Sequence, residues 1–268
     1  MPTIVSSLFW LGCGAATSDS GGSDYTDQDF DGGVSVEADA TLGPGEGDIE
    51  STWARRHVMA GIAELPAFGP KTNLTVTLGK VSVLRTASGF MAREETCDVQ
   101  IVRPEVTEIT TVIPDAFRAS IATIDRPLYI DQGQWIFEQA IQVQGAHLVN
   151  PHAEALPTDA EDPRVYDQDQ DGLPGVTVLI EGIIDGTVQV VQRTRTRMVG
   201  IRQGARIAGA LQWSSEESII AANDPILEND VPLTPSPNPA ESDFVAVEIT
   251  ADVTCEDIRN MGDSLFSP

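Results

Sequence analysis

Three aspartates at alternate positions are the most chemically informative feature of the chain. Asp167, Asp169 and Asp171 lie in the segment Tyr166-Asp-Gln-Asp-Gln-Asp-Gly-Leu-Pro-Gly175. Gly172 follows them, so a tight turn can direct the three carboxylates toward one centre. Hard oxygen ligands in a flexible loop suit Ca²⁺, whereas Mg²⁺ demands stricter octahedral geometry. The spacing therefore predicts a calcium-binding loop.

The segment matches only the first half of an EF-hand loop. Acids occupy loop positions 1, 3 and 5, glycine occupies position 6, and a backbone carbonyl ligand is expected from Leu173 at position 7. Position 12, where a bidentate Glu belongs, is Val178, and a strand pattern replaces the second helix. Such truncated loops resemble the Asp-rich calcium loops of thrombospondin type 3 repeats, in which other parts of the fold supply the missing ligands. Candidates nearby are Asp159, Glu161 and Asp162. The alternative is an acidic, solvated turn without an ion.

A second copy of the pattern, Asp27-Gln-Asp29-Phe-Asp31-Gly32, occurs near the N-terminus. Gly, Ser, Thr and Asp dominate residues 14–33, and no strong strand pattern precedes the loop. This setting favours a disordered acidic tether over a second ordered calcium site.

The N-terminal 13 residues form a short apolar run that ends in a small residue and Cys13. This run resembles the end of a bacterial lipoprotein signal, in which the cysteine carries the lipid. It departs from that pattern at Trp10, where leucine is usual, and it lacks the basic residues of a signal peptide. The resemblance implies lipidation of Cys13 and a place in the cell envelope, as an outer membrane lipoprotein, or outside the cell. The alternative is an N-terminal tail without this role.

Composition divides the remainder into a linker and one domain. Residues 14–52 carry many acids and no Lys or Arg, so they should stay extended. Residues 53–268 are predicted to form a single β-rich domain, since the hydrophobic content of 41% is sufficient for a packed core. A net charge of -25 excludes nucleic acid as a partner and disfavours direct contact with an anionic membrane. Membrane contact is therefore expected only through the lipid anchor.

The fold class is predicted to be mainly β, an antiparallel β-barrel or sandwich of about ten strands with a few short helices. Alternation of apolar and polar residues, with Gly or Pro at most junctions, places the strands. They are expected at 55–65, 74–85, 93–103, 105–113, 127–130, 134–143, 176–184, 187–199, 201–213 and 244–253. Short helices are expected from Pro114 to Ala122, from Ser214 to Asn223 through a capping box with Glu217, and after Thr254.

With Cys13 assigned to lipid, Cys97 and Cys255 remain as a candidate disulfide. In the chain-entropy model, closing so long a loop stabilises the fold by at most roughly 5 kcal/mol. The alternative is a pair of buried free thiols in a reducing compartment.

Five arginines, at positions 193, 195, 197, 202 and 206, stand out against the acidic background. Period-two spacing places Arg193, Arg195 and Arg197 on one face of a strand. They could form an anion-binding row at a barrel mouth, or surface ion pairs with the acidic segment 207–258. The sequence favours the ion pairs.

No catalytic motif stands out. The chain lacks a G-x-S-x-G elbow, a P-loop and a dinucleotide fingerprint. Asn150 and Pro151 separate His147 from His152 and Glu154, which rules out helical zinc-site spacing. These observations favour a protein that is not an enzyme, although a hydrolase with an unrecognised site remains an alternative.

Three phrases resemble a group of uncharacterised lipoproteins of myxobacterial type. They are residues 111–117, residues 156–178, which include the aspartate loop, and residues 190–197. The resemblance supports location and calcium rather than an activity. The preferred hypothesis is a non-catalytic, cell-envelope or secreted β-domain with a structural calcium loop. The alternative is a lipocalin-like barrel that binds a small anionic or apolar ligand; a protein partner is not indicated.

Overall fold

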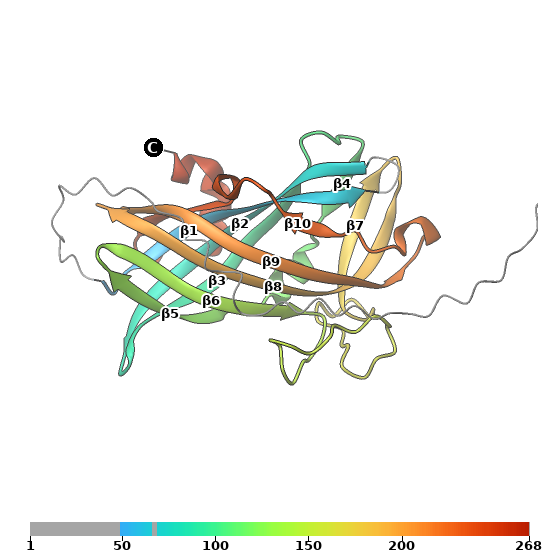
Figure 1. The fold of residues 1–268 in the computed structure, drawn as a ribbon, viewed down its shortest axis with the longest axis horizontal. Helices are drawn as coiled ribbons and strands as arrows, with labels where there is room; N and C mark the ends of the chain where they lie inside the picture. The colour runs from blue at the N-terminus through green and yellow to red at the C-terminus, as the bar shows by residue number, and fades with distance from the viewer. Residues whose placement is uncertain (1–48, 66–68, 268) are drawn as a thin grey trace, which may run out of the picture. The chain divides into compact units, whose positions relative to one another are not determined.

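Eleven antiparallel strands form most of the chain that this computed structural model describes, residues 49–65 and 69–267 (Figure 1). The predicted fold class is confirmed. The predictions for residues 1–13 with Cys13, for residues 14–48 of the linker and for the Asp27–Asp31 repeat lie outside the described residues. Ile49 already packs against the hydrophobic core, and the first strand begins at Thr52.

The strands are β1 (Thr52–Leu65), β2 (Gly69–Thr86), β3 (Gly89–Val102), β4 (Ile109–Val112), β5 (Ile124–Asp131), β6 (Gln134–Gln144), β7 (Val176–Gly182), β8 (Gly186–Gln203), β9 (Arg206–Ala222), β10 (Leu233–Pro235) and β11 (Asp243–Ile249). The helices are α1 (Asp115–Ser120), α2 (Cys255–Met261) and the 3₁₀ turns η1 (Pro225–Leu227), η2 (Pro239–Glu241) and η3 (Gly262–Phe266). Within the described ranges, no helix has the length and apolar character needed to cross a bilayer.

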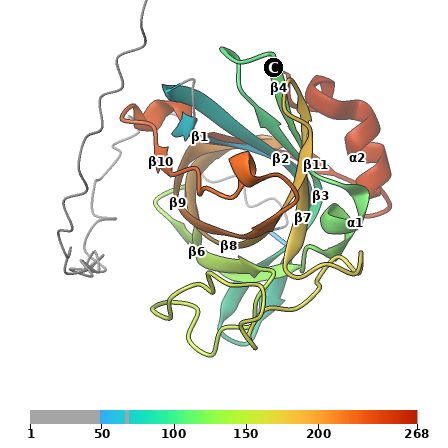
Figure 2. The same cartoon turned by 90° about the vertical axis from the view of Figure 1, so that its right-hand side faces the viewer.

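Hydrogen bonds close the sheet into a barrel. The order β8-β6-β5-β3-β2-β1-β11-β9 returns to its start because β9 also pairs with β8, from Val188↔Ala222 to Gln203↔Arg206. Figure 2 views the ring of strands from one end. Where these pairings run around the whole ring, the strands have no free edge.

The second edge of β8 is shared by two strands. Residues 192–201 of β8 pair with β6, and residues 186–190 pair with β7. Because β6 and β7 both run antiparallel to β8, they follow one another along the same edge. Loop 145–175 leaves the barrel wall between β6 and β7. It therefore separates the two strands that pair with this edge of β8.

Different strands complete the wall around the β7 end of the barrel. There β4 pairs with β7 and lies beside β3, while β10 pairs with β1 and lies beside β9. The long strands β1, β2, β3, β8 and β9 thus extend through two successive sections. One section is completed by β5, β6 and β11, and the other by β4, β7 and β10.

The interior of the first section is filled by large side chains. Trp53 and Trp135 meet edge to face with ring centroids 5.7 Å apart, and Phe137 meets Phe244 in the same way at 5.8 Å. Such contacts stabilise the packing by about 0.5–1.5 kcal/mol per pair beyond their buried area. This packed section closes one end of the barrel.

Two predicted helices are present and one is wrong. Pro114 precedes α1, and Thr254 forms a capping box with Asp257 at the start of α2. Residues 214–223, predicted as a helix, are instead the end of β9, which extends to Ala222. Pairing along the whole of β8 fixes this segment as a strand, whatever its local capping pattern.

The C-terminal helix lies against the outer face of β2 and β3. Ile258 and Phe266 pack with Ala54, Leu78 and Cys97 in a small external core. The sulfur atoms of Cys97 and Cys255, the expected pair, lie 1.96 Å apart. The bridge therefore attaches α2 to the barrel wall.

We predict that the double variant Cys97→Ser, Cys255→Ser loses about 2–5 kcal/mol of unfolding free energy, measured by urea denaturation, because the bridge restricts the unfolded chain. A reducing agent should lower the stability of the native chain to that of the variant and leave the variant unchanged. Equal stability of the two proteins under oxidising conditions would contradict the prediction.

Candidate functional site

The predicted aspartate cluster is assembled in the structure. One carboxylate oxygen from each of Asp167, Asp169 and Asp171 lies within 4.8 Å of the others. Positive φ angles at Gln170 (59°) and Gly172 (90°) bend the backbone so that the three side chains converge. Three oxygen ligands in this arrangement could hold a metal ion.

Hydrogen bonds hold two of the three carboxylates within the loop. Asp167 accepts from the amides of Asp171 (3.2 Å) and Gly172 (2.9 Å), and Asp171 accepts from the amide of Leu173 (2.8 Å). The carbonyl of Leu173, the fourth expected ligand, belongs to the same turn, and its role as a ligand stays a prediction. Hydrogen bonds from backbone amides to the carboxylates of Asp167 and Asp171 thus stabilise the conformation of the loop.

Asp169 differs from its neighbours because it is buried. The residue is only 7% exposed to solvent. Its Oδ2 accepts a hydrogen bond from the amide of Thr177 at the start of β7 (2.9 Å). Its Oδ1 is buried without a hydrogen-bond partner. Burial raises the pKa of Asp169, and the negative charges of Asp171 and Asp167 raise it further, while the Thr177 amide opposes the shift. A cation between the three carboxylates would remove this electrostatic cost.

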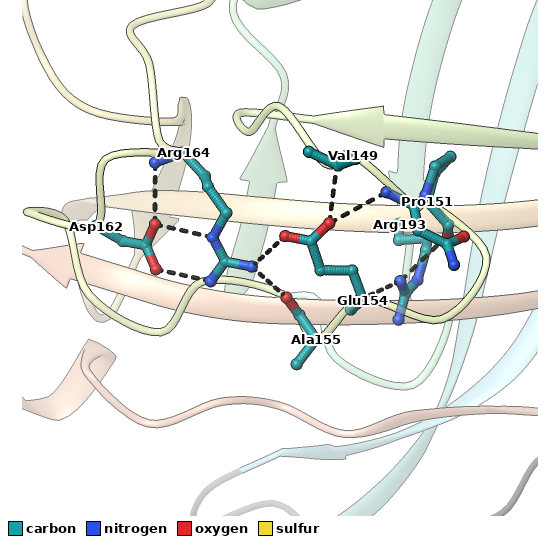
Figure 3. A network of polar contacts seen from close by, with 8 residues as sticks. Val149, Pro151, Glu154, Ala155, Asp162, Arg164 and Arg193 are labelled. Atoms are coloured by element: carbon teal, nitrogen blue, oxygen red, sulfur yellow. Dashed lines mark hydrogen bonds and ion pairs between the residues drawn. The ribbon is translucent and has the colours of Figure 1, made fainter.

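Of the acids proposed to complete the ligand set, Asp162 and Asp159 make hydrogen bonds outside the aspartate cluster. Arg164 binds both oxygens of Asp162, at 2.9 and 2.7 Å, and these hydrogen bonds lower the pKa of Asp162 to about 2 (Figure 3). Asp159 accepts from the amide of Glu161. None of the three belongs to the carboxylate cluster found among the described residues. Asp162, one of these candidates, is therefore paired with Arg164, and its role as a ligand stays a prediction.

The same network ties loop 145–175 to the barrel. Arg164 donates to Glu154, whose other oxygen accepts from the amides of Val149 and Asn150. Arg193 on β8 donates to the carbonyls of Pro151 (3.2 Å) and Glu154 (2.6 Å) (Figure 3). The ion-pair network thus fixes the part of the loop that precedes the aspartates.

Gln168 connects the aspartates to the barrel wall. Its Oε1 accepts from the amide of Gly145 (2.7 Å), and its Nε2 donates to Gln144 at the end of β6. Gly145 and Gly175 sit where a Cβ would lie 2.7 and 2.6 Å from the carbonyl oxygen of Val190, so only glycine fits at either end of the loop. The break between β6 and β7 therefore holds the aspartate loop at a defined position.

The second section of the barrel encloses a cavity of about 720 Å³. Its walls are inward-facing residues of both the long strands and β4, β6, β7 and α1, and many of them are apolar. Representative apolar residues are Ile101, Ile113, Phe117, Val178, Ile180, Val190 and Ile219. Figure 2 looks toward the end of the barrel where η1 and the chain leading to β10 contribute to the lining. The volume lies in the range of small-molecule sites.

Charged residues form the closed end of this cavity, next to the aromatic section. Arg55, Glu94 and Arg126, at most 4% exposed, are members of β1, β3 and β5. Glu94 lies 2.6 Å from Nη1 of Arg55 and 3.0 Å from Nη2 of Arg126. We call these three residues, together with the adjacent His57, the polar floor. Burial lowers the pKa of His57 well below its usual value, and the positive charges of Arg55, Arg126 and Arg56 lower it further.

Glu217 projects into the cavity nearer its mouth. Gln192, its partner across the β8–β9 pair, also lines the cavity. Glu217 lines the cavity and keeps solvent exposure there. Burial, the larger cause, and the negative charge of Asp230 together raise its pKa to about 7, while the positive charge of Arg103 opposes the shift.

Arg193, Arg195 and Arg197 lie on the outer face of β8, because the alternate residues Gln192, Thr194 and Thr196 line the cavity. Arg193 and Arg195 both pair with Glu216, and Arg197 lies 3.8 Å from Glu138. Arg202 pairs with Glu248 at 3.0 Å. The alternative of an anion-binding row at the mouth is therefore wrong, and the expected surface ion pairs are found.

The sequence analysis missed the residues that do line the cavity. Arg55 and His57 sit at alternate positions of β1, as Arg193 and Arg195 do on β8, so spacing alone does not separate inward from outward arginines. The sequence did contain one indication: Arg55 occupies the same face of the strand as the apolar Trp53 and Met59, which is the face expected to point inward.

Comparison of the chain with protein families, curated proteins and solved structures returns no match. The resemblance to lipoproteins of myxobacterial type therefore stays a prediction. Function must be argued from the aspartate loop and the cavity.

We predict that Glu217→Gln makes the protein more stable above pH 7 and that this advantage disappears near pH 4. A carboxyl whose pKa is raised from 4.5 to about 7 binds more protons when folded, so the native chain loses stability as pH rises through this interval. Thermal melting across this pH range measures the difference.

Glu228→Gln is the matched control, because Glu228 is exposed on the segment that follows β9. It should leave the pH profile of melting unchanged. A parallel profile for Glu217→Gln and the native chain would show that Glu217 titrates in solvent.

Proposed function

We propose that this protein is a non-catalytic, calcium-stabilised β-barrel that holds a small, largely apolar molecule in its interior. The observation that carries the proposal is the cavity of about 720 Å³ in the second barrel section. Closely packed interiors leave few voids larger than a water molecule, so a space of this size in a folded barrel favours an occupant. The apolar walls favour a molecule that leaves water readily.

Calcium fits the aspartate loop better than other common ions do. All three side-chain ligands are carboxylates on one flexible loop, which suits Ca²⁺ better than Mg²⁺, since Mg²⁺ requires near-ideal octahedral geometry. Zinc and copper sites usually include His or Cys, and the cluster has neither. The unpartnered Oδ1 of Asp169 supports a cation at this position.

The ion would have a structural role. Asp169 is hydrogen-bonded to Thr177 at the start of β7, and Gln168 is hydrogen-bonded to Gln144 at the end of β6. A cation in the loop would fix the point at which the wall passes from one strand to the other. Its expected effect is on stability and on the order of the cavity wall.

We further propose that the barrel acts in the cell envelope or outside the cell, attached through lipid at Cys13. The disulfide between Cys97 and Cys255 supports this location, since such bonds persist in oxidising compartments.

Calcium should raise the melting temperature of the protein. A ligand that binds only the folded state stabilises it by about 2.7 kcal/mol at one hundred times its Kd, which corresponds to roughly 5–10 °C for a domain of this size. Differential scanning calorimetry with calcium and with chelator measures the shift. An unchanged melting temperature at saturating calcium would exclude a structural ion.

Asp169→Asn tests the assignment of the site. Asparagine keeps an acceptor for the Thr177 amide but removes the buried charge, so the variant should melt at a higher temperature than the native chain in chelator and should not respond to calcium. Asp131→Asn, a change at an exposed acid beyond the loop, should keep the full calcium response. If both variants respond to calcium as the native chain does, the ion lies elsewhere.

The cavity should bind a neutral fluorescent probe such as N-phenyl-1-naphthylamine, which becomes brighter in apolar surroundings. Thr75→Trp should reduce this binding on the order of tenfold or more, because Thr75 lines the cavity and an indole would fill part of it. Val76→Trp is the matched control, since its side chain lies on the other face of β2. Equal binding by both variants would place the probe on the outer surface.

A further inference from the structure

We propose that the polar floor is an anion-binding subsite, and that the molecule held in the barrel is a single-chain amphiphile with a carboxylate or similar monoanionic head group. The head group would lie against Arg55, and the apolar chain would extend along the cavity toward its mouth. This inference rests on the proposed ligand-binding function and specifies the class of ligand.

The charges of the polar floor do not balance. Arg55 and Arg126 face the single carboxylate of Glu94, which leaves one positive charge in excess within a region at most 4% exposed. His57 does not alter this sum, because its low pKa keeps it neutral at neutral pH. A buried charge without a counter-charge is costly, and an anion arriving through the cavity would provide one.

The two arginines are held differently. Arg126 donates to Glu94, to the carbonyls of Glu138 and Thr196 and to the Thr196 hydroxyl. Arg55 makes an ion pair with Glu94 through Nη1, and the Nε atoms of both arginines are buried without a hydrogen-bond partner. Arg126, with four hydrogen bonds, is therefore a positioning residue for Glu94, whereas Arg55, held by its ion pair with Glu94, is the arginine available to a ligand.

Two further observations give the floor the form of a binding site. Gly79 lies opposite Arg55, where a Cβ would be 3.6 Å from its Nη2, so the absence of a side chain leaves space around the guanidinium. Nδ1 of His57 is also buried without a partner. Arg55 and His57, two residues apart on β1, both line the cavity and offer unfilled hydrogen-bonding positions to one head group.

The charges nearer the mouth support the same orientation. There one base, Arg103, and two acids, Glu217 and Asp230, line the cavity, so this region is negative when both acids are ionised. Between the floor and the mouth the walls carry Ile113, Val178 and Ile219. When both acids are ionised, the field along the cavity favours an anionic group at the floor and repels it from the mouth, although the chain as a whole carries a charge of -25.

The test compares three probes of equal chain length on the full chain: dodecanoate, dodecanol and dodecyltrimethylammonium. Displacement of N-phenyl-1-naphthylamine gives the affinity of each at neutral pH. We expect dodecanoate to bind roughly ten- to a hundredfold more tightly than dodecanol, the value of one charge-assisted hydrogen-bonded contact. The cationic probe should bind least tightly.

Arg55→Met assigns the preference to the polar floor. The variant keeps the Glu94–Arg126 pair and removes the excess charge, so dodecanoate and dodecanol should bind equally while dodecanol affinity stays near its native value. Arg55→Lys retains the charge and should retain part of the preference. Each variant is compared by the ratio of its two affinities, which a modest loss of stability does not change.

The outcomes separate the two proposals. Equal binding of dodecanoate and dodecanol to the native chain, or an unchanged preference in Arg55→Met, would overturn the anionic subsite and leave a barrel for neutral ligands. Failure of all the probes, including the fluorescent one, would overturn the ligand-binding function itself. Tighter binding of the cationic probe would reverse the proposed orientation.

Discussion

Pairing of β8 along both of its edges is the constraint on which the rest of the structure depends. β9 closes the ring on one edge, while β6 and β7 divide the other between them. This division forces the chain out of the wall at Gly145 and back at Gly175, and the excursion carries the three aspartates. The closed ring also fixes which residues of each strand face inward. Both the aspartate loop and the cavity therefore result from the same hydrogen-bonded ladder.

The inside of the barrel changes character along its length. Trp53, Trp135 and Phe137 fill one section, and the next layer carries the buried Arg55, Glu94 and Arg126. Removing two guanidinium groups and a carboxylate from water costs several kcal/mol per ion, and apolar residues of similar size often give equal or greater stability. These charges are thus poorly explained as a stabilising device. The proposed role in binding would explain both their excess of one positive charge and their position at the end of a cavity.

The aspartate loop and the cavity share a segment of wall. Gln168, between Asp167 and Asp169, donates to Gln144, which lines the cavity, and Asp169 accepts from Thr177, next to the cavity residue Val178. Arg193 joins the preceding part of the loop to the outer face of β8. Outward and inward residues of the same strand thus have separate tasks, one in holding the loop and the other in forming the cavity.

The sequence by itself determined the features that depend on short-range pattern. Alternation predicted the mainly β fold, the spacing of Asp167, Asp169 and Asp171 predicted their convergence, and Thr254 with Asp257 predicted the start of α2. Capping residues misled at Ser214 and Glu217, because a local helix signal cannot compete with a ladder of hydrogen bonds to β8. Only the tertiary structure decided that Arg193 pairs with Glu216 on the outer face of β8 while Arg55 lines the cavity. It also decided that Asp162 pairs with Arg164. Alternate spacing defines two faces of a strand, but only closure of the ring decides which of them becomes the interior.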